Sequence, residues 1–214
     1  MKTRLFIICA VALALSACQT AYYSAMEQMG IPKREILVDR ITEAQEAQLD
    51  GQEQFQDALA QFRSVVNFNG GDLENIYDRL NSEFEDSESA AERIRERIAA
   101  VESVSEALFD EWEDELDEYS NQNLRRDSER QLRATRSRYA QLIGAMRRAE
   151  ATLDPVLDAL RDNVLYLRHN LNAQAVASLR GELDTINTDV DSLVRAMQQA
   201  IAESDRFIAE MRGQ

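Results

Sequence analysis

The residue whose chemistry is easiest to specify in this chain is Cys18, which stands at the end of a short apolar segment. Residues 5–15 are apolar; they follow Lys2 and Arg4 and are followed by Ser16, Ala17 and Cys18. A cysteine in this position can carry acyl chains, and several acyl chains hold a protein stably at a membrane surface. The only other cysteine, Cys9, lies inside the apolar segment.

These features predict a lipoprotein signal peptide over residues 1–17, removed by cleavage before Cys18. The apolar segment has the length of a secretory signal, about 7–15 residues. It is too short to span a bilayer, which takes about 20 residues. Residue 19 is glutamine, not the aspartate that retains many lipoproteins at the inner membrane of Gram-negative bacteria. We therefore expect acylated Cys18 in the periplasmic leaflet of the outer membrane; the periplasmic face of the inner membrane is the alternative.

The cleaved chain would lack most of the residues that catalytic sites usually contain. No thiol would remain for a disulfide, a redox motif or a cysteine nucleophile. The chain has a single histidine, His169. A di-iron site needs paired Glu-x-x-His motifs, and a zinc site needs several histidine or cysteine ligands, so neither site can be assembled. We expect His169 to lie near a helix end in contact with solvent. The sequence thus predicts a protein that is not an enzyme and that holds no cofactor or metal.

Two blocks of opposite charge adjoin each other in the middle of the chain. Residues 102–118 contain nine acidic residues and no basic one, whereas residues 124–148 contain eight arginines and two acidic residues. Each block opposes the dipole of its own helix end. We therefore expect the blocks to compensate each other across an antiparallel hairpin, with Glu113 near Arg130 and Asp110 near Arg133.

Other uses of these blocks remain open. The planar guanidinium of arginine suits bidentate contacts with anions, so one alternative is a face for an anion or a partner, formed by Arg125, Arg126, Arg130, Arg133 and Arg136. The acidic block could instead bind a divalent cation, although it lacks the spaced acids and the glycine of a calcium loop. The net charge of −15, or −17 without Lys2 and Arg4, disfavours nucleic acid as a partner.

Long helices would position all of these residues. Apolar residues recur at spacings of three and four over residues 37–65, 73–119, 132–171 and 179–211, the pattern of helices packed side by side. Gln48, Gly51, Ser87 and Ser105 interrupt this pattern with small or polar side chains. The aromatic residues on it are expected in the core: Phe55, Phe62, Phe84, Trp112 and Tyr139.

The helix breaks decide the topology. Two breaks fall at residues 67–72 and 120–123, and the third falls either at Pro155 or at residues 169–172. The latter gives helices of about 36, 48, 48 and 40 residues, and antiparallel neighbours with short loops should match in length. We therefore predict a kinked helix through Pro155. The fold is predicted to be an elongated, antiparallel, up-down four-helix bundle over residues 33–214, with coiled-coil-like heptad packing. A three-helix bundle with one long protruding helix is the alternative, and residues 18–32 would form a short membrane tether.

Four stretches carry a resemblance to a known family: AYYSAMEQMGIPKREILVDR at 21–40, ALFDEWEDELDEYSN at 107–121, LRRDSERQLR at 124–133 and LRHNLNAQAVASL at 167–179. In these stretches the chain resembles an uncharacterised family of Gram-negative lipoproteins defined by a domain of unknown function. The resemblance covers nearly the whole cleaved chain. It implies a class of protein and supplies no activity.

The sequence favours a non-enzymatic, membrane-anchored envelope lipoprotein whose helical bundle binds a protein or cell-wall partner in the periplasm. One alternative is a bundle that binds a lipid or another apolar ligand between its helices, at the small and polar positions of the core. An enzyme of unrecognised type is the third hypothesis. The identity of the partner and the oligomeric state are left open by the sequence.

Overall fold

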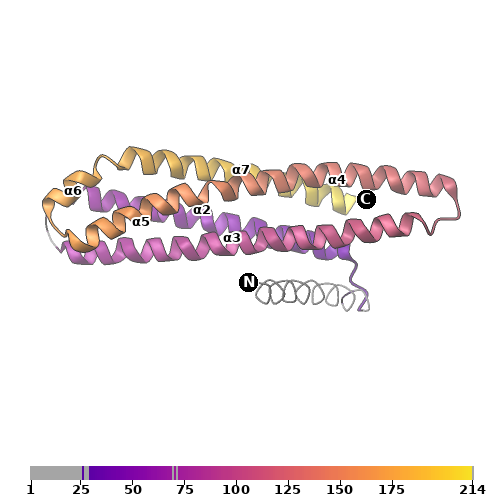
Figure 1. The fold of residues 1–214 in the computed structure, drawn as a ribbon, viewed down its shortest axis with the longest axis horizontal. Coiled ribbons are helices and arrows are strands. Elements are labelled where there is room, and N and C mark those ends of the chain that lie inside the picture. Colours follow the sequence, from indigo (N-terminus) through magenta and orange to yellow (C-terminus); the bar gives the residue numbers. More distant parts are fainter. Residues whose placement is uncertain (1–25, 27–28, 69, 71, 214) are drawn as a thin grey trace, which may run out of the picture.

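An elongated bundle of long helices forms the described part of the chain (Figure 1). The structure is a computed structural model, which describes residues 26, 29–68, 70 and 72–213. These residues form helices and no strand, which confirms the predicted all-α fold. None of these helices is long and apolar enough to cross a membrane. The predicted signal peptide, Cys18 and most of the predicted tether lie outside the described residues.

Four long antiparallel segments build the bundle, and a short helix lies at one end of it. The helices are α2 (Lys33–Val66), α3 (Leu73–Leu116), α4 (Gln122–Ala151), α5 (Leu153–His169), α6 (Ala173–Leu179) and α7 (Leu183–Gly213). In Figure 1, α5 continues the direction of α4, so these two helices together make the third long segment. The predicted up-down order of four long segments is therefore confirmed.

The predicted heptad pattern is the core of the bundle. On α2, every position of the pattern from Leu37 to Val65 is buried, including the polar Gln48 and the small Gly51. A Cβ atom added to Gly51 would lie 2.6 Å from Cδ1 of Ile94 on α3. The glycine therefore lets the two helices approach closely, and the side chain of Ile94 fills the space beside it.

Each predicted break is a turn that a polar side chain caps. The Asp72 carboxylate accepts a hydrogen bond from the Asn75 amide at 3.2 Å, at the start of α3. The side chain of Asn121 accepts from the amide of Asn123 at 2.9 Å, at the start of α4. Such side chains satisfy amides of the first helical turn, which have no partner within the helix. The turns at residues 67–72 and 120–123 are thus confirmed.

The third segment bends at Thr152 and turns at residues 169–172, as predicted from the helix lengths. Thr152 retains a helical backbone conformation between α4 and α5. Pro155 is the third residue of α5, where its missing N–H would have had no partner within the helix. The helix therefore accommodates Pro155 after a bend and ends only at His169.

The last predicted helix is not continuous, which corrects the sequence-based expectation. It is divided by a turn over residues 180–182 into the short α6 and the long α7. Glycine at position 181 favours this break because glycine is a poor helix former. The turn lets α6 close the end of the bundle, where the Arg180 side chain donates to the Val66 carbonyl at 3.3 Å.

At the opposite end, the α3–α4 hairpin extends past both the start of α2 and the end of α7 (Figure 1). We call residues 112–136 the arm and the rest of the bundle the body. The predicted alternative with one protruding helix is wrong, because two helices protrude together. In the body each long helix is flanked by two others, whereas in the arm α3 and α4 have only each other.

Candidate functional site

The arm contains the adjoining ends of the two charge blocks, and ion pairs link its two helices. Arg136 pairs with Glu113, and Arg125 pairs with Asp117 at 2.9 Å. The Arg125 side chain also donates to the Leu116 carbonyl at 2.9 Å. The guanidinium of Arg136 donates to the Glu113 carboxylate and thereby holds the pKa of Glu113 below its usual value. The expected compensation across the hairpin is therefore present.

The predicted register of this pairing was wrong. Arg130 pairs with Asp127, and Arg133 pairs with Glu129 at 2.5 Å, so both remain on their own helix. Arg125 and Arg136 lie seven residues before and four after the buried Leu132, which places them on the same side of α4 as that residue. Arg130 and Arg133 do not share this spacing, so their side chains point away from α3.

Each of the five arginines proposed as one anion or partner face has a partner within the bundle. Arg125 and Arg136 pair with acids of α3, and Arg130 and Arg133 pair with acids of α4. Arg126 donates to the Gln122 carbonyl and the Asn123 side chain, both at 3.1 Å. At 3.6 residues per turn their positions span about 140° of the circumference of α4, which is one broad side of the helix. The geometry therefore favours structural pairing over a common anion site.

A cluster of aromatic rings connects the arm to the body. Tyr139 of α4 packs edge-on against Phe109 of α3, with ring centroids 5.4 Å apart, and against Phe207 of α7 at 6.4 Å. The guanidinium of Arg136 lies 5.2 Å from the centre of the Phe109 ring, on the side of the arm. Burial raises the pKa of the Tyr139 hydroxyl. These contacts fix the base of the arm to three helices.

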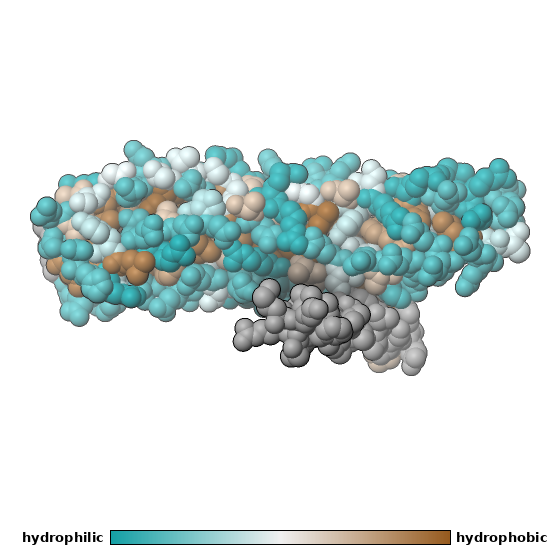
Figure 2. All heavy atoms as spheres, viewed as in Figure 1, coloured by the Kyte–Doolittle hydropathy of each residue, from teal (hydrophilic) through white to brown (hydrophobic). Residues whose placement is uncertain are grey.

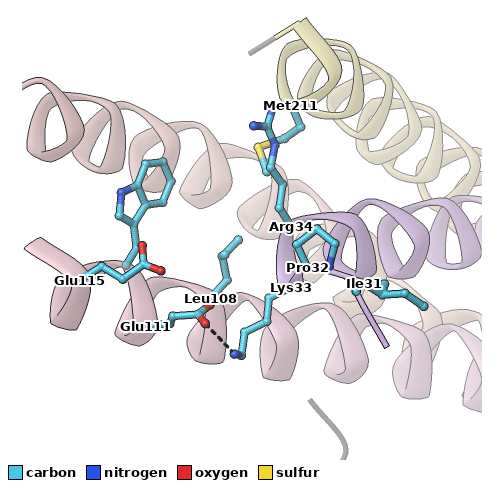
Figure 3. Close-up of a pocket in the computed structure, with 10 residues that line it drawn as sticks. Ile31, Pro32, Lys33, Arg34, Leu108, Glu111, Glu115 and Met211 are labelled. Atoms are coloured by element: carbon cyan, nitrogen blue, oxygen red, sulfur yellow. Dashed lines mark ion pairs between the residues drawn. The ribbon is translucent and has the colours of Figure 1, made fainter. Parts of the chain in front are cut away.

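A cleft of about 550 Å³ lies at the base of the arm, where α2 begins and α7 ends (Figure 3). Its lining includes Ile31 and Arg34 from the start of α2, Leu108 and Trp112 from α3, and Met211 from α7. Lys33 and Glu111 form an ion pair of 3.1 Å at its edge. The cleft thus combines an apolar surface with charged groups of both signs.

The prediction that all five aromatic residues of the heptad pattern lie in the core is wrong for Trp112. Phe55, Phe62 and Phe84 are buried, and Tyr139 is half-buried against the core, whereas Trp112 is half-buried and lines the cleft. Its indole N–H donates to the Ser128 hydroxyl at 2.8 Å. The residue lies on the apolar side of α3, but α2 and α7 end too early to cover it. Unequal helix lengths, about 48 residues against 36 and 40 in the sequence, were the signal that could have indicated this.

The small and polar positions of the core are filled by neighbouring groups. Ser87 and Ser105 donate to the carbonyls of Glu83 and Glu102 at 2.7 and 2.8 Å, within their own helix. Gln48 is fully buried, and within the described part of the chain neither atom of its amide has a hydrogen-bond partner. Ile94 fills the space beside Gly51, so packing and hydrogen bonds within the bundle account for the glycine and the two serines.

The described residues form no candidate metal site. Within them, no group of three or more His, Cys, Asp or Glu side chains is arranged to hold a metal ion, and this includes the acidic block. His169 is exposed at the last position of α5, far along the chain from the arm. His169 therefore lies at a helix end in contact with solvent, as the sequence predicted.

Comparison with known proteins places the chain in a family. No curated protein matches it. A family model described as a protein of unknown function, DUF2959, matches residues 22–211. This match spans α2 to α7 and therefore both the body and the arm. The chain belongs to the DUF2959 family of proteins of unknown function.

Proposed function

We propose that this protein is a non-enzymatic lipoprotein of the bacterial envelope, anchored through Cys18, whose helical bundle binds a protein or cell-wall partner in the periplasm. Its anchor lies in the periplasmic leaflet of the outer membrane, with the inner membrane as the alternative. The observation that carries the proposal is the place where the chain enters the bundle, which lies 15 residues after Cys18 in the sequence. The chain enters the body at Lys33, beside the cleft and the base of the arm.

This position puts the arm close to the anchored end of the protein. Lys33 lies 15 residues after Cys18, so the entry point lies at most about 50–54 Å from the membrane at roughly 3.3–3.6 Å per residue. The arm starts beside this entry point, and the end closed by α6 lies at the far end of the bundle. An anchored bundle would therefore present its least covered helices within reach of the membrane.

The features of the bundle favour a binding surface over an internal ligand site. The core positions that might have held an apolar ligand are filled by Ile94 or bonded within their own helices. The cleft and the arm instead offer a half-buried tryptophan and exposed charges at the surface. Binding of a partner by this end of the molecule is thus the better-supported function.

Anchoring is tested by labelling cells with radioactive palmitate and separating their membranes. We expect the natural chain to incorporate label and to sediment with the outer membrane. Cys18→Ala should lose both properties, whereas the matched control Cys9→Ala, in the segment proposed to be removed, should retain both. Labelling of Cys18→Ala, or a natural chain without label, would contradict anchoring through Cys18.

A further inference from the structure

We propose that a basic hollow on the body binds a phosphate group with two negative charges, either as inorganic phosphate or as a phosphate monoester. The hollow has a volume of about 340 Å³ and lies between α4 and α7. Its lining includes Arg148 of α4 and both Arg195 and Arg206 of α7. The inference goes beyond the proposed function, because it concerns a different surface of the bundle and does not depend on Cys18.

The sign of its charge distinguishes this hollow from the surface around it. The chain has 39 acidic residues against 24 lysines and arginines, and Figure 2 shows hydrophilic side chains over most of the visible face. The cleft at the base of the arm is lined by two basic and two acidic side chains, and a hollow beside α5 and α6 by two acidic ones. The hollow between α4 and α7 instead has three arginines and one acid, Glu203. Its charge therefore favours an anion as the ligand.

Two of the three arginines supply this excess of positive charge. Arg206 pairs with Glu203 at 3.0 Å. Arg195 donates to the Ser192 hydroxyl at 3.2 Å, and among the described residues no acidic side chain pairs with Arg195 or Arg148. A guanidinium group has five N–H donors. Both arginines thus retain donors for an external anion.

The packing of the two helices brings the arginines to the same level of the bundle. Arg138 pairs with Glu210 at 2.8 Å, which sets the antiparallel register of α4 and α7. Six residues farther along α4 and six residues back along α7, Gly144 lies level with the helical turn that contains Arg206. A Cβ atom added to Gly144 would lie 3.4 Å from Nη1 of Arg148. The glycine therefore lets this guanidinium group lie against α4, close to the level of Arg206.

Small side chains line the hollow between the arginines. Ala145 of α4 is buried, and Ala202 of α7 is half-buried. Gln198 and Gln199 add side-chain amides to the lining. Guanidinium groups bind phosphate through planar, bidentate and charge-assisted hydrogen bonds. A phosphate monoester carries about two negative charges at neutral pH, which matches the two arginines that lack an acidic partner.

The acidic arm of a second copy is the alternative occupant. Glu115 and Glu118 are exposed on the arm, so their carboxylates are accessible to another molecule. Two copies that each carry a net charge of −15 repel each other, however. A small phosphate ligand brings the same charge to the hollow without this repulsion.

Phosphorus NMR tests the proposal on the full chain, purified in a detergent without phosphate and kept at constant ionic strength near neutral pH. Inorganic phosphate and glycerol phosphate are titrated separately, and their resonances report the bound fraction. We expect both to bind. Tighter binding of glycerol phosphate would assign the hollow to a monoester, and tighter binding of the inorganic ion would assign it to free phosphate. Succinate that displaces phosphate at an equal or lower concentration would overturn the proposal.

Matched variants locate the binding. Arg148→Gln with Arg195→Gln removes one arginine from each helix of the hollow and should raise the Kd for phosphate about tenfold. The control, Arg79→Gln with Arg93→Gln, removes the same charge from two exposed positions of α3 and should change the Kd less than about twofold. All four side chains are exposed, so both variants should remain folded in thermal melts.

Two outcomes of these measurements would overturn the proposal. Equal weakening in both double variants, or none in the first, would mean that binding follows net charge and not the hollow. Light scattering tests the second copy. A dimer that dissociates in the variant with Arg148→Gln and Arg195→Gln, together with phosphate that fails to bind the natural chain, would assign the hollow to a second copy instead.

Discussion

α3 passes through two environments, and they differ in what holds the helix in place. In the body, its residues Leu80, Ile94 and Ile98 are almost completely buried between neighbouring helices. In the arm, its last apolar residue, Leu116, is half-buried, and the contacts with α4 include ion pairs and hydrogen bonds at the surface beside the buried Leu132. The same heptad spacing runs through both parts. Burial therefore depends on how many helices reach a given level of the bundle.

The difference between the body and the arm indicates which part stabilises the fold and which part can bind a partner. Apolar surface removed from water stabilises a fold by about 25 cal/mol per Å², whereas exposed ion pairs contribute roughly 0–1 kcal/mol each. The body should therefore supply nearly all of the free energy of unfolding. The arm can vary its charges at small cost, and its uncovered side remains accessible to a partner.

The largest expected effect on the free energy of unfolding comes from truncating a buried side chain in the core of the body. Phe55 is completely buried, so Phe55→Ala should lower the free energy of unfolding by about 3–5 kcal/mol through lost burial and a cavity. The matched change in the arm, Leu124→Ala at a side chain that is 54% exposed, should cost about 0.5 kcal/mol or less. Urea denaturation measures both. Similar losses at the two sites would refute the distinction between body and arm.

A second change should stabilise the body. The amide of Gln48 is fully buried without a partner among the described residues, and such a group costs about 1–3 kcal/mol. Gln48→Met keeps the shape and removes the polar atoms, so it should raise the free energy of unfolding by a comparable amount. Gln56→Met, at an exposed position of α2, is the control and should change little. A destabilised Gln48→Met protein would mean that the amide is satisfied.

Charge reversal in the arm should have a smaller effect that depends on position. Arg136→Glu removes the contact with Phe109, which contributes about 0.5–1 kcal/mol at an exposed site, and places a second carboxylate beside Glu113. We expect the Tm to fall by a few degrees. Arg130→Glu, which affects only a pair within α4, should lower it less. If thermal melts showed a larger fall in Tm for Arg130→Glu than for Arg136→Glu, they would support the register expected from the sequence instead.

The smallest effect concerns pH. The pKa of Glu113 is lowered in the folded protein by the hydrogen bond from Arg136. The stabilisation is therefore present above the ordinary carboxyl pKa and is lost as the pH falls through the lower, folded value. The urea midpoint of the natural protein should drop more between pH 7 and pH 3 than that of Glu113→Gln. In an Arg136→Gln background this difference should vanish; its persistence would assign the shift to another group.

Much of the fold could be predicted because its signals are local. Asp72 and Asn121 mark helix starts through hydrogen bonds to amides two or three residues away. The pattern from Leu37 to Val65 marks the buried side of α2 from spacing alone. The break after Leu179 was missed because the apolar pattern continues through the turn at residues 180–182.

The candidate site was predictable only in part. The charge blocks and their opposition across a hairpin follow from the sequence, but the choice of Arg136 as partner of Glu113 depends on the rotation of α4 against α3. The burial of Leu132 shows which side of α4 faces inward. The exposure of Trp112 likewise depends on the ends of α2 and α7, which lie far from it in the sequence.

The sequence by itself determined the helical class, the order of the long segments and the positions of most turns, because helix periodicity and capping act within a few residues. It also carries the signal-like segment ending at Cys18. Only the tertiary structure decided that the α3–α4 hairpin stands out as an arm with a cleft at its base. Each helical residue adds about 1.5 Å, so modest differences in length leave two helices uncovered, and which ends coincide depends on contacts between distant parts of the chain.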